Sequence, residues 1–100
     1  MGLLSNDADT RPEMVDLPTN SHELGDLTFI QAGIDLPFEV RRVYYIYGIP
    51  TSAERGGHAH RTNSELVVAV AGSFSVYLES SDGLKQSYLL ENPRRGLLIP

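Results

Sequence analysis

Residues 65–91, which read ELVVAVAGSFSVYLESSDGLKQSYLLE, decide the fold class of this chain. Residues 73–79 alternate between apolar and polar side chains, the period of a β-strand with one buried face. The Ser-Asp-Gly sequence at residues 81–83 is typical of a hairpin turn, because Gly can adopt a positive φ. A second predicted strand over 85–91 follows at once, so the stretch predicts an antiparallel hairpin.

The neighbouring segments also have the composition of strands. Residues 65–71 are apolar at successive positions, which is typical of a strand buried on both faces. Residues 27–32 and 39–47 are rich in β-branched and aromatic side chains, and 97–99 begin a further apolar run. No helical apolar period occurs in this region, so short strands at regular spacing predict an all-β sandwich, barrel or jelly roll.

The chain divides into a tail and one domain. Residues 1–23 are polar, contain Pro12 and Pro18, and have no sustained apolar period, so we expect a disordered N-terminal tail. Residues 24–100 form the predicted domain. Its last strand has only begun at residues 97–100, so we expect the domain to be truncated at its C-terminal end.

Composition excludes several classes of function. A formal charge of −5 argues against nucleic acid as a partner, because phosphate contacts need clustered Lys and Arg. No apolar run is long enough to cross a membrane, and the N-terminus lacks the pattern of a secretory signal. The chain has no cysteine, so we expect no disulfide and a cytoplasmic location.

Two histidines stand in the sequence Arg-Gly-Gly-His-Ala-His at residues 55–60. Residues two apart on a strand point to the same side, so His58 and His60 would project together, roughly 7 Å apart. Two converging imidazoles can bind a metal, or one can act as a base near neutral pH while the other binds substrate. The alternative is that both are exposed and idle.

The histidine pair and its surroundings resemble a known family. His58, His60, Glu65 and Gly72 follow the spacing of the first cupin signature. The closer resemblance is to the dTDP-4-keto-6-deoxyglucose 3,4-ketoisomerases, the WxcM-like small cupins, and it implies a cupin jelly roll, a double-stranded β-helix. The segments that carry it are Gly25-Asp26-Leu27, Pro37-Phe38, Arg41-Arg42-Val43-Tyr44-Tyr45-Ile46, Arg55-Gly56-Gly57-His58-Ala59-His60, Gly72-Ser73-Phe74, and Pro93 with Gly96-Leu97.

The resemblance implies an isomerase of deoxysugar biosynthesis. Such enzymes move the keto group of a dTDP-4-keto-6-deoxyhexose from C4 to C3 through an enediol, and they need no cofactor. By resemblance, His58 is the catalytic base and His60 is a second catalytic residue. Arg55 resembles a substrate-binding arginine, and the partner expected is a second copy of the chain, with N-terminal strands (here residues 27–32) exchanged between subunits.

Arg42 and Tyr44 match a further part of the family pattern, and we expect them to bind the diphosphate or nucleotide. A guanidinium suits a diphosphate because it can make bidentate contacts. Adjacent residues on a strand face opposite ways, so Arg41 and Tyr45 would point away from the site. We expect Tyr45 in the core or at a dimer interface.

Glu65 departs from the family pattern, which usually has Gln at this position. With Glu, His58, His60 and Glu65 could together bind a metal ion, as in metal-dependent cupins. Two alternatives to the isomerase therefore stay open. One is a metal-binding cupin, and the other is a non-catalytic sugar-binding cupin domain.

Overall fold

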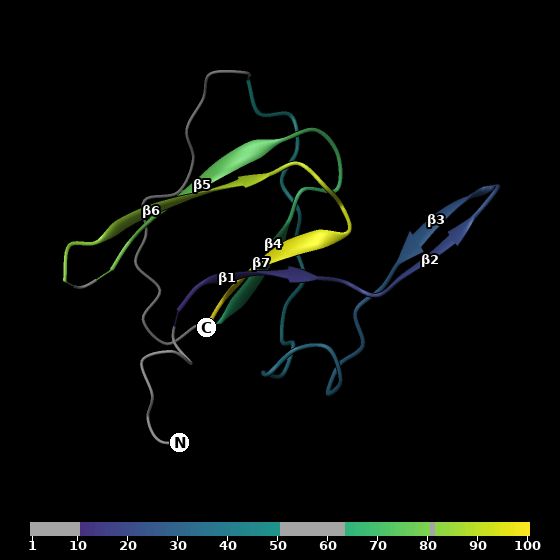
Figure 1. The fold of residues 1–100 in the computed structure, drawn as a ribbon, viewed down its shortest axis with the longest axis horizontal. Coiled ribbons are helices and arrows are strands. Elements are labelled where there is room, and N and C mark those ends of the chain that lie inside the picture. Colours follow the sequence, from purple (N-terminus) through teal and green to yellow (C-terminus); the bar gives the residue numbers. More distant parts are fainter. Residues whose placement is uncertain (1–10, 51–63, 81) are drawn as a thin grey trace.

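The structure is a computed structural model that describes residues 11–50, 64–80 and 82–100. Within these ranges the chain forms seven strands and no helix, and hence no helix that could cross a membrane. All strand pairs are antiparallel (Figure 1). The strands are β1 (Glu13–Asp16), β2 (Thr19–His22), β3 (Gly25–Thr28), β4 (Glu65–Val68), β5 (Phe74–Glu79), β6 (Lys85–Leu90) and β7 (Arg95–Ile99).

A three-stranded sheet in the order β1-β7-β4 forms the centre of the molecule. β7 is the middle strand, and its Leu97 lies opposite Met14 of β1 and Val67 of β4. The sheet therefore joins the two ends of the described chain. Gly96 in β7 leaves room for the side chains of β4, since a Cβ there would lie 2.8 Å from Cδ1 of Leu66 and 3.1 Å from Cγ2 of Val68.

The predicted β5–β6 hairpin is confirmed. Phe74 pairs with Leu90 and Glu79 with Lys85. In the connection, the Ser80 amide donates to the Leu84 carbonyl over 2.8 Å, and Gly83 has a φ of 88°. Only Gly adopts such a φ without steric strain, which is why the turn forms at this position.

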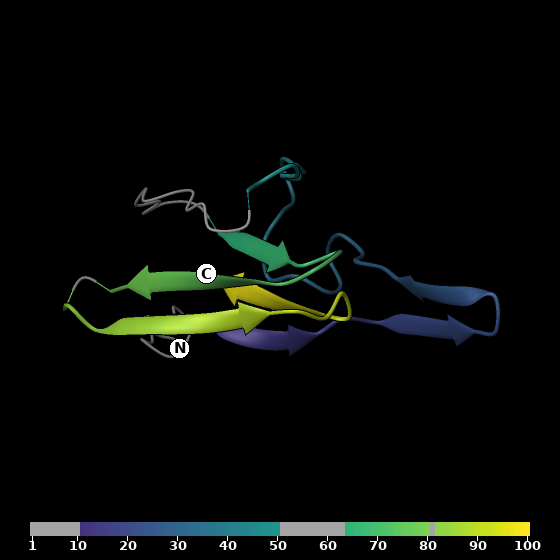
Figure 2. The ribbon, with the colours of Figure 1, turned by 90° about the horizontal axis from the view of Figure 1, so that it is seen from above.

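Side chains from the three-stranded sheet and from the β5–β6 hairpin form one core. Ala69, Leu90 and Leu97 are buried, and Leu97 is fully inaccessible. The alternation of β5 places its inward side chains against this cluster, as the sequence predicted. The partly buried residues packed against the cluster are Met14, Val67, Val76, Leu78, Tyr88 and Ile99. The β5–β6 hairpin and the three-stranded sheet therefore pack together as a small β-sandwich (Figure 2).

The β2–β3 hairpin projects away from this sandwich in both views (Figures 1 and 2). It corrects the expected division of the chain, because β1 and β2 lie inside residues 1–23, the range assigned to a disordered tail. The polar segment forms strands because other strands satisfy its backbone: the distant β7 pairs with β1, and the adjacent β3 pairs with β2 in a hairpin. Residues 1–10 lie outside the described ranges.

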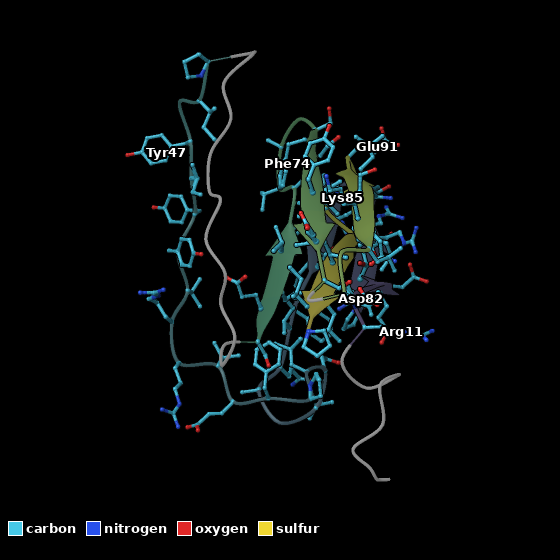
Figure 3. All side chains as sticks on the ribbon, turned by 90° about the vertical axis from the view of Figure 1, so that its left-hand side faces the viewer. Arg11, Tyr47, Phe74, Asp82, Lys85 and Glu91 are labelled. Atoms are coloured by element: carbon cyan, nitrogen blue, oxygen red, sulfur yellow. The ribbon has the colours of Figure 1, made fainter. Side chains whose placement is uncertain are left out.

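The strand expected over residues 39–47 is absent. Within the described residues this segment has no ladder partner, and it runs apart from the sheets, where Figure 3 shows Tyr47 pointing outward. A strand exists only where a neighbour takes up its backbone hydrogen bonds, so high β-propensity alone did not suffice. The strand expected over residues 27–32 is also shorter, because β3 ends at Thr28.

Candidate active site

The structure divides the predicted site residues into two groups. Arg55, His58 and His60 lie outside the described residues, so their predicted arrangement stays a prediction. Arg42, Tyr44 and Glu65 are described.

Glu65 opens β4, five positions after His60 in the sequence. It pairs with Ile99, and its side chain is half-buried. Strand alternation places Glu65 on the same face of β4 as Val67 and the buried Ala69, which is the face toward the core of the sandwich. A carboxylate is therefore held at the inner face, at the end of β4 that follows the histidine pair.

Arg42 and Tyr44 lie together. The guanidinium carbon of Arg42 sits 5.1 Å from the centroid of the Tyr44 ring, within the range of a cation–π contact. The rings of Tyr45 and Tyr47 form a separate pair with centroids 6.0 Å apart. Arg42 and Tyr44 are therefore in contact, as expected, while the expected division between two faces stays a prediction. All four are exposed, so Tyr45 lies outside the core of the described residues, and its place at a dimer interface stays a prediction.

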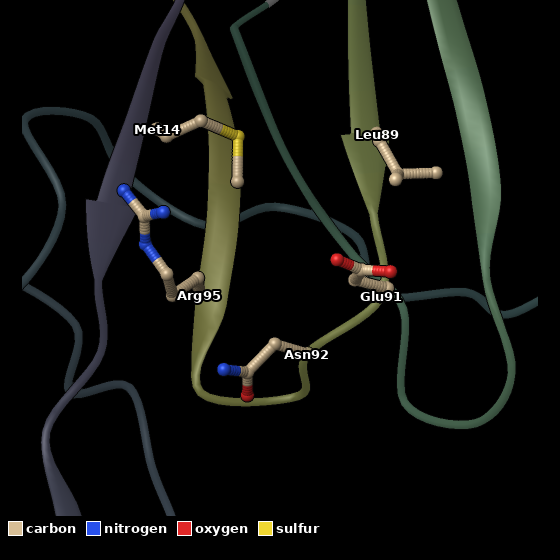
Figure 4. Close-up of a pocket in the computed structure, with 5 residues that line it drawn as sticks. All are labelled: Met14, Leu89, Glu91, Asn92 and Arg95. Atoms are coloured by element: carbon tan, nitrogen blue, oxygen red, sulfur yellow. The ribbon is translucent and has the colours of Figure 1, made fainter.

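Two hollows in the described part of the molecule contain no predicted site residue in their lining. One, of about 140 Å³, lies at the Arg95 end of β7 and is lined by Met14, Leu89, Glu91, Asn92 and Arg95 (Figure 4). Glu65 pairs with the opposite end of β7, so this hollow is separate from the predicted site. An open hollow of about 390 Å³ is lined by Ala32, Gly33, Leu36, Pro37, Phe38 and Glu39.

Among the described residues, no ion pair joins Arg42 to Glu65, and no three metal-ligating side chains converge. The predicted set of His58, His60 and Glu65 includes two residues outside those ranges. Of these three predicted ligands, the structure therefore describes only the carboxylate of Glu65.

An ion pair that the sequence analysis missed joins Arg94 to Asp26, with 2.7 Å between Nη2 and Oδ2. The hydrogen bond from Arg94 lowers the pKa of Asp26 below its usual 3.8. The partners are 68 positions apart, and nothing in the local sequence of either one indicates the other.

An all-β sandwich in which Glu65 opens β4, five positions after the His-Ala-His triplet, fits a protein of the cupin class. The chain belongs to the family described as WxcM-like, C-terminal (FdtA), whose model matches residues 10–100. The fold class predicted from the sequence is confirmed by the solved structures described next.

The relatives of this chain are sugar ketoisomerases. It is 33% identical over 75 residues to the TDP-4-oxo-6-deoxy-α-D-glucose-3,4-oxoisomerase of Aneurinibacillus thermoaerophilus. It is similar in structure to QdtA, a sugar 3,4-ketoisomerase from Thermoanaerobacterium thermosaccharolyticum solved with TDP, at 30% identity and a TM-score of 0.83 over 88% of this chain. A histidine-to-asparagine variant of QdtA, solved with TDP-4-keto-6-deoxyglucose, matches 97% of this chain at 28% identity and a TM-score of 0.82.

The chain is shorter than these relatives. It spans 53% of the length of the Aneurinibacillus enzyme, 64% of QdtA in its complex with TDP and 66% of the variant.

Proposed function

We propose that this protein is a dTDP-sugar 3,4-ketoisomerase that converts a dTDP-4-keto-6-deoxyhexose to its 3-keto isomer for deoxysugar biosynthesis. The observation that carries the proposal is the family membership over residues 10–100, together with relatives whose names state this reaction. The complexes of QdtA with TDP and with TDP-4-keto-6-deoxyglucose support a thymidine-linked sugar as the substrate class.

The reaction requires a base near neutral pH and donors that stabilise an enediolate. His58 takes the proton from C3, and the electron pair of that C–H bond forms the C3–C4 double bond while O4 gains negative charge. O4 is then protonated, O3 loses its proton, and C4 receives a proton as the C3 carbonyl forms. Atoms and charge balance, and no oxidant enters or leaves.

The remaining predicted residues bind and orient this substrate. His60 assists proton transfer or holds the sugar, and Arg55 binds the substrate. Arg42 offers a guanidinium to the diphosphate, and its contact with the Tyr44 ring supports this role because it restricts the guanidinium's freedom.

A metal-binding cupin is the second candidate, and the inward position of Glu65 favours it. A carboxylate at the inner face suits divalent metal together with two imidazoles, and His58, His60 and Glu65 would be the ligands. A bound metal would supply Lewis-acid stabilisation of the enediolate oxygen. The non-catalytic sugar-binding domain is the remaining alternative.

We further infer that the protein acts as a homodimer in which N-terminal strands are exchanged, and that it is cytoplasmic. The projecting β2–β3 hairpin supports exchange, because Leu24 at its tip is 89% exposed and Leu27 is 60% exposed. Side chains of this size are usually covered in an assembly when they cluster on a projecting element. The acidic net charge argues against nucleic acid as a further partner.

The test is turnover of dTDP-4-keto-6-deoxyglucose by the wild-type chain and by His58→Asn, followed by NMR of the sugar. We expect the variant to lose roughly 10²–10⁴-fold in kcat, the usual contribution of a general base. Binding of dTDP, measured by calorimetry, should stay unchanged.

His22→Asn is the matched control, since His22 is exposed and its Nδ1 only accepts a hydrogen bond from the Leu24 amide within the β2–β3 hairpin. Full activity in His58→Asn would refute its role as the base. Activity that EDTA abolishes and added metal restores would favour the metal-binding candidate. Binding of dTDP without turnover in the wild type would identify a sugar-binding domain.

A further inference from the structure

The β2–β3 hairpin is attached to the sandwich through a short link. Leu17 and Pro18 are the only residues between β1 and β2. Leu17 is buried, with 8% exposed, and its amide donates to the Arg94 carbonyl over 2.8 Å. The base of the hairpin is therefore fixed to the turn that joins β6 to β7.

The side chain of Arg94 continues from this base along the hairpin. Its Nη2 donates to Oδ2 of Asp26 on β3 over 2.7 Å and lies 3.5 Å from Oγ of Ser21 on β2. Asp26 and Ser21 are paired across the two strands. One guanidinium thus contacts both strands of the hairpin.

Hydrogen bonds within the β6–β7 turn hold the backbone of Arg94 in place. The Arg94 amide donates to Oδ1 of Asn92 over 2.8 Å, and the Arg95 amide donates to the Asn92 carbonyl over 3.2 Å. These bonds shape the β6–β7 turn, so Arg94 leaves the sandwich in a defined direction.

Arg95 provides an internal comparison. Its Nε lies 2.9 Å from Oδ1 of Asp16, and the two residues are paired across β7 and β1. This ion pair lies within one sheet and contacts no part of the hairpin. Two adjacent arginines with similarly exposed side chains (49% and 46%) therefore act on different parts of the molecule.

We propose that Arg94 is a positioning residue that fixes the direction of the β2–β3 hairpin and so prepares it to pair with a second copy of this chain. The second part rests on the homodimer inferred above. Leu17 attaches the base of the hairpin to the β6–β7 turn, and the bond from Arg94 to Asp26 adds a second attachment on β3 that restricts the direction of the hairpin. Ordering the hairpin before association reduces the entropy lost when the two copies pair.

Spin-label distances test the first part directly. The chain has no cysteine, so Leu24→Cys at the hairpin tip and Ser87→Cys on the exposed face of β6 give one defined pair. Dilution of labelled chains with unlabelled ones removes distances between copies. We expect a narrow distance distribution in the parent, and a broader, shifted one with Arg94→Ala or Asp26→Asn.

Arg95→Ala is the matched control and should leave the distribution unchanged. A general loss of stability would broaden both variants equally, so the difference between them separates positioning from folding. Arg94→Lys retains the charge and should restore part of the narrow distribution. An Arg94→Ala distribution as narrow as that of the parent would overturn the proposal.

The second part is tested by sedimentation. Arg94→Ala should raise the Kd of the dimer about two- to five-fold, the range expected for one exposed ion pair, while Arg95→Ala should not. An equal Kd in the two variants would overturn a role in association. A wild type that stays monomeric would refute the inferred homodimer, and with it the role toward a second copy, while the distance measurement would still decide the positioning role.

Discussion

Arg94 and Arg95 are neighbours in sequence, yet their side chains pair with carboxylates on different strands, Asp26 on β3 and Asp16 on β1. Arg94 lies in the β6–β7 turn and Arg95 begins β7, so the two side chains start from differently shaped parts of the backbone. Arg42 contacts Tyr44, and Tyr45 contacts Tyr47, so residues two positions apart form two separate pairs. At the scale of single residues, a contact between near neighbours such as Arg42 and Tyr44 can be predicted from the sequence. The distant partner of Arg94 cannot.

The pKa of Asp26 should depend on Arg94. The hydrogen bond from Arg94 favours the ionised carboxylate, so the pKa of Asp26 lies below 3.8. A lowered pKa means that this contribution to stability is present above the ordinary pKa and is lost as the pH falls through the lowered value. In Arg94→Ala we expect the pKa of Asp26, measured by NMR titration of the carboxyl carbon, to rise toward 3.8.

Asp82 serves as the control for that titration. Its pKa is lowered mainly by the hydrogen bond from the Ser80 hydroxyl, which Arg94→Ala does not touch, so it should stay low. An Asp26 pKa that is the same with and without Arg94 would contradict the assignment.

At the scale of elements, a strand formed where its backbone found a partner. β1 is short and polar at both ends, yet it pairs with β7 along its whole length. Residues 39–47 have higher β-propensity and pair with no described strand. The consequence is an exposed apolar stretch, in which Val43, Tyr45 and Tyr47 are each more than 80% exposed.

The β7 strand should carry much of the stability, because Leu97 is fully buried where the two sheets meet. Leu97→Ala removes buried methyl groups and leaves a cavity, which we expect to lower the free energy of unfolding by about 2–5 kcal/mol. Urea unfolding followed by circular dichroism would measure it. Leu89→Ala, at a side chain that is 56% exposed, is the control and should cost much less. Equal losses would show that the core does not lie between the sheets.

The whole molecule exposes a large amount of apolar surface outside its sandwich, on the β2–β3 hairpin and on residues 43–49. Among the described residues only a few apolar side chains are buried, which favours assembly as a further source of burial. The inferred homodimer places the hairpin, with Leu24 and Leu27, in the interface.

Leu27→Lys should therefore weaken the dimer by about tenfold or more, because it places a charge where a leucine would be buried on association. Sedimentation velocity over a range of concentrations would measure the change. Leu84→Lys at the tip of the β5–β6 hairpin is the matched control, since Leu84 is 58% exposed against 60% for Leu27. A similar effect from both variants would count against the hairpin as the interface.

The amino-acid sequence by itself determined the β5–β6 hairpin, the all-β class and the family, because these depend on alternation, turn residues and motif spacing within short windows. Of the site, it determined that Arg42 and Tyr44 lie together, for the same reason. Only the tertiary structure decided that β1 and β2 exist, that residues 39–47 lack a described partner, and that Arg94 holds Asp26. The pairing of β1 with β7 and of Arg94 with Asp26 depends on partners far apart in sequence, and no local pattern encodes which distant group will be near.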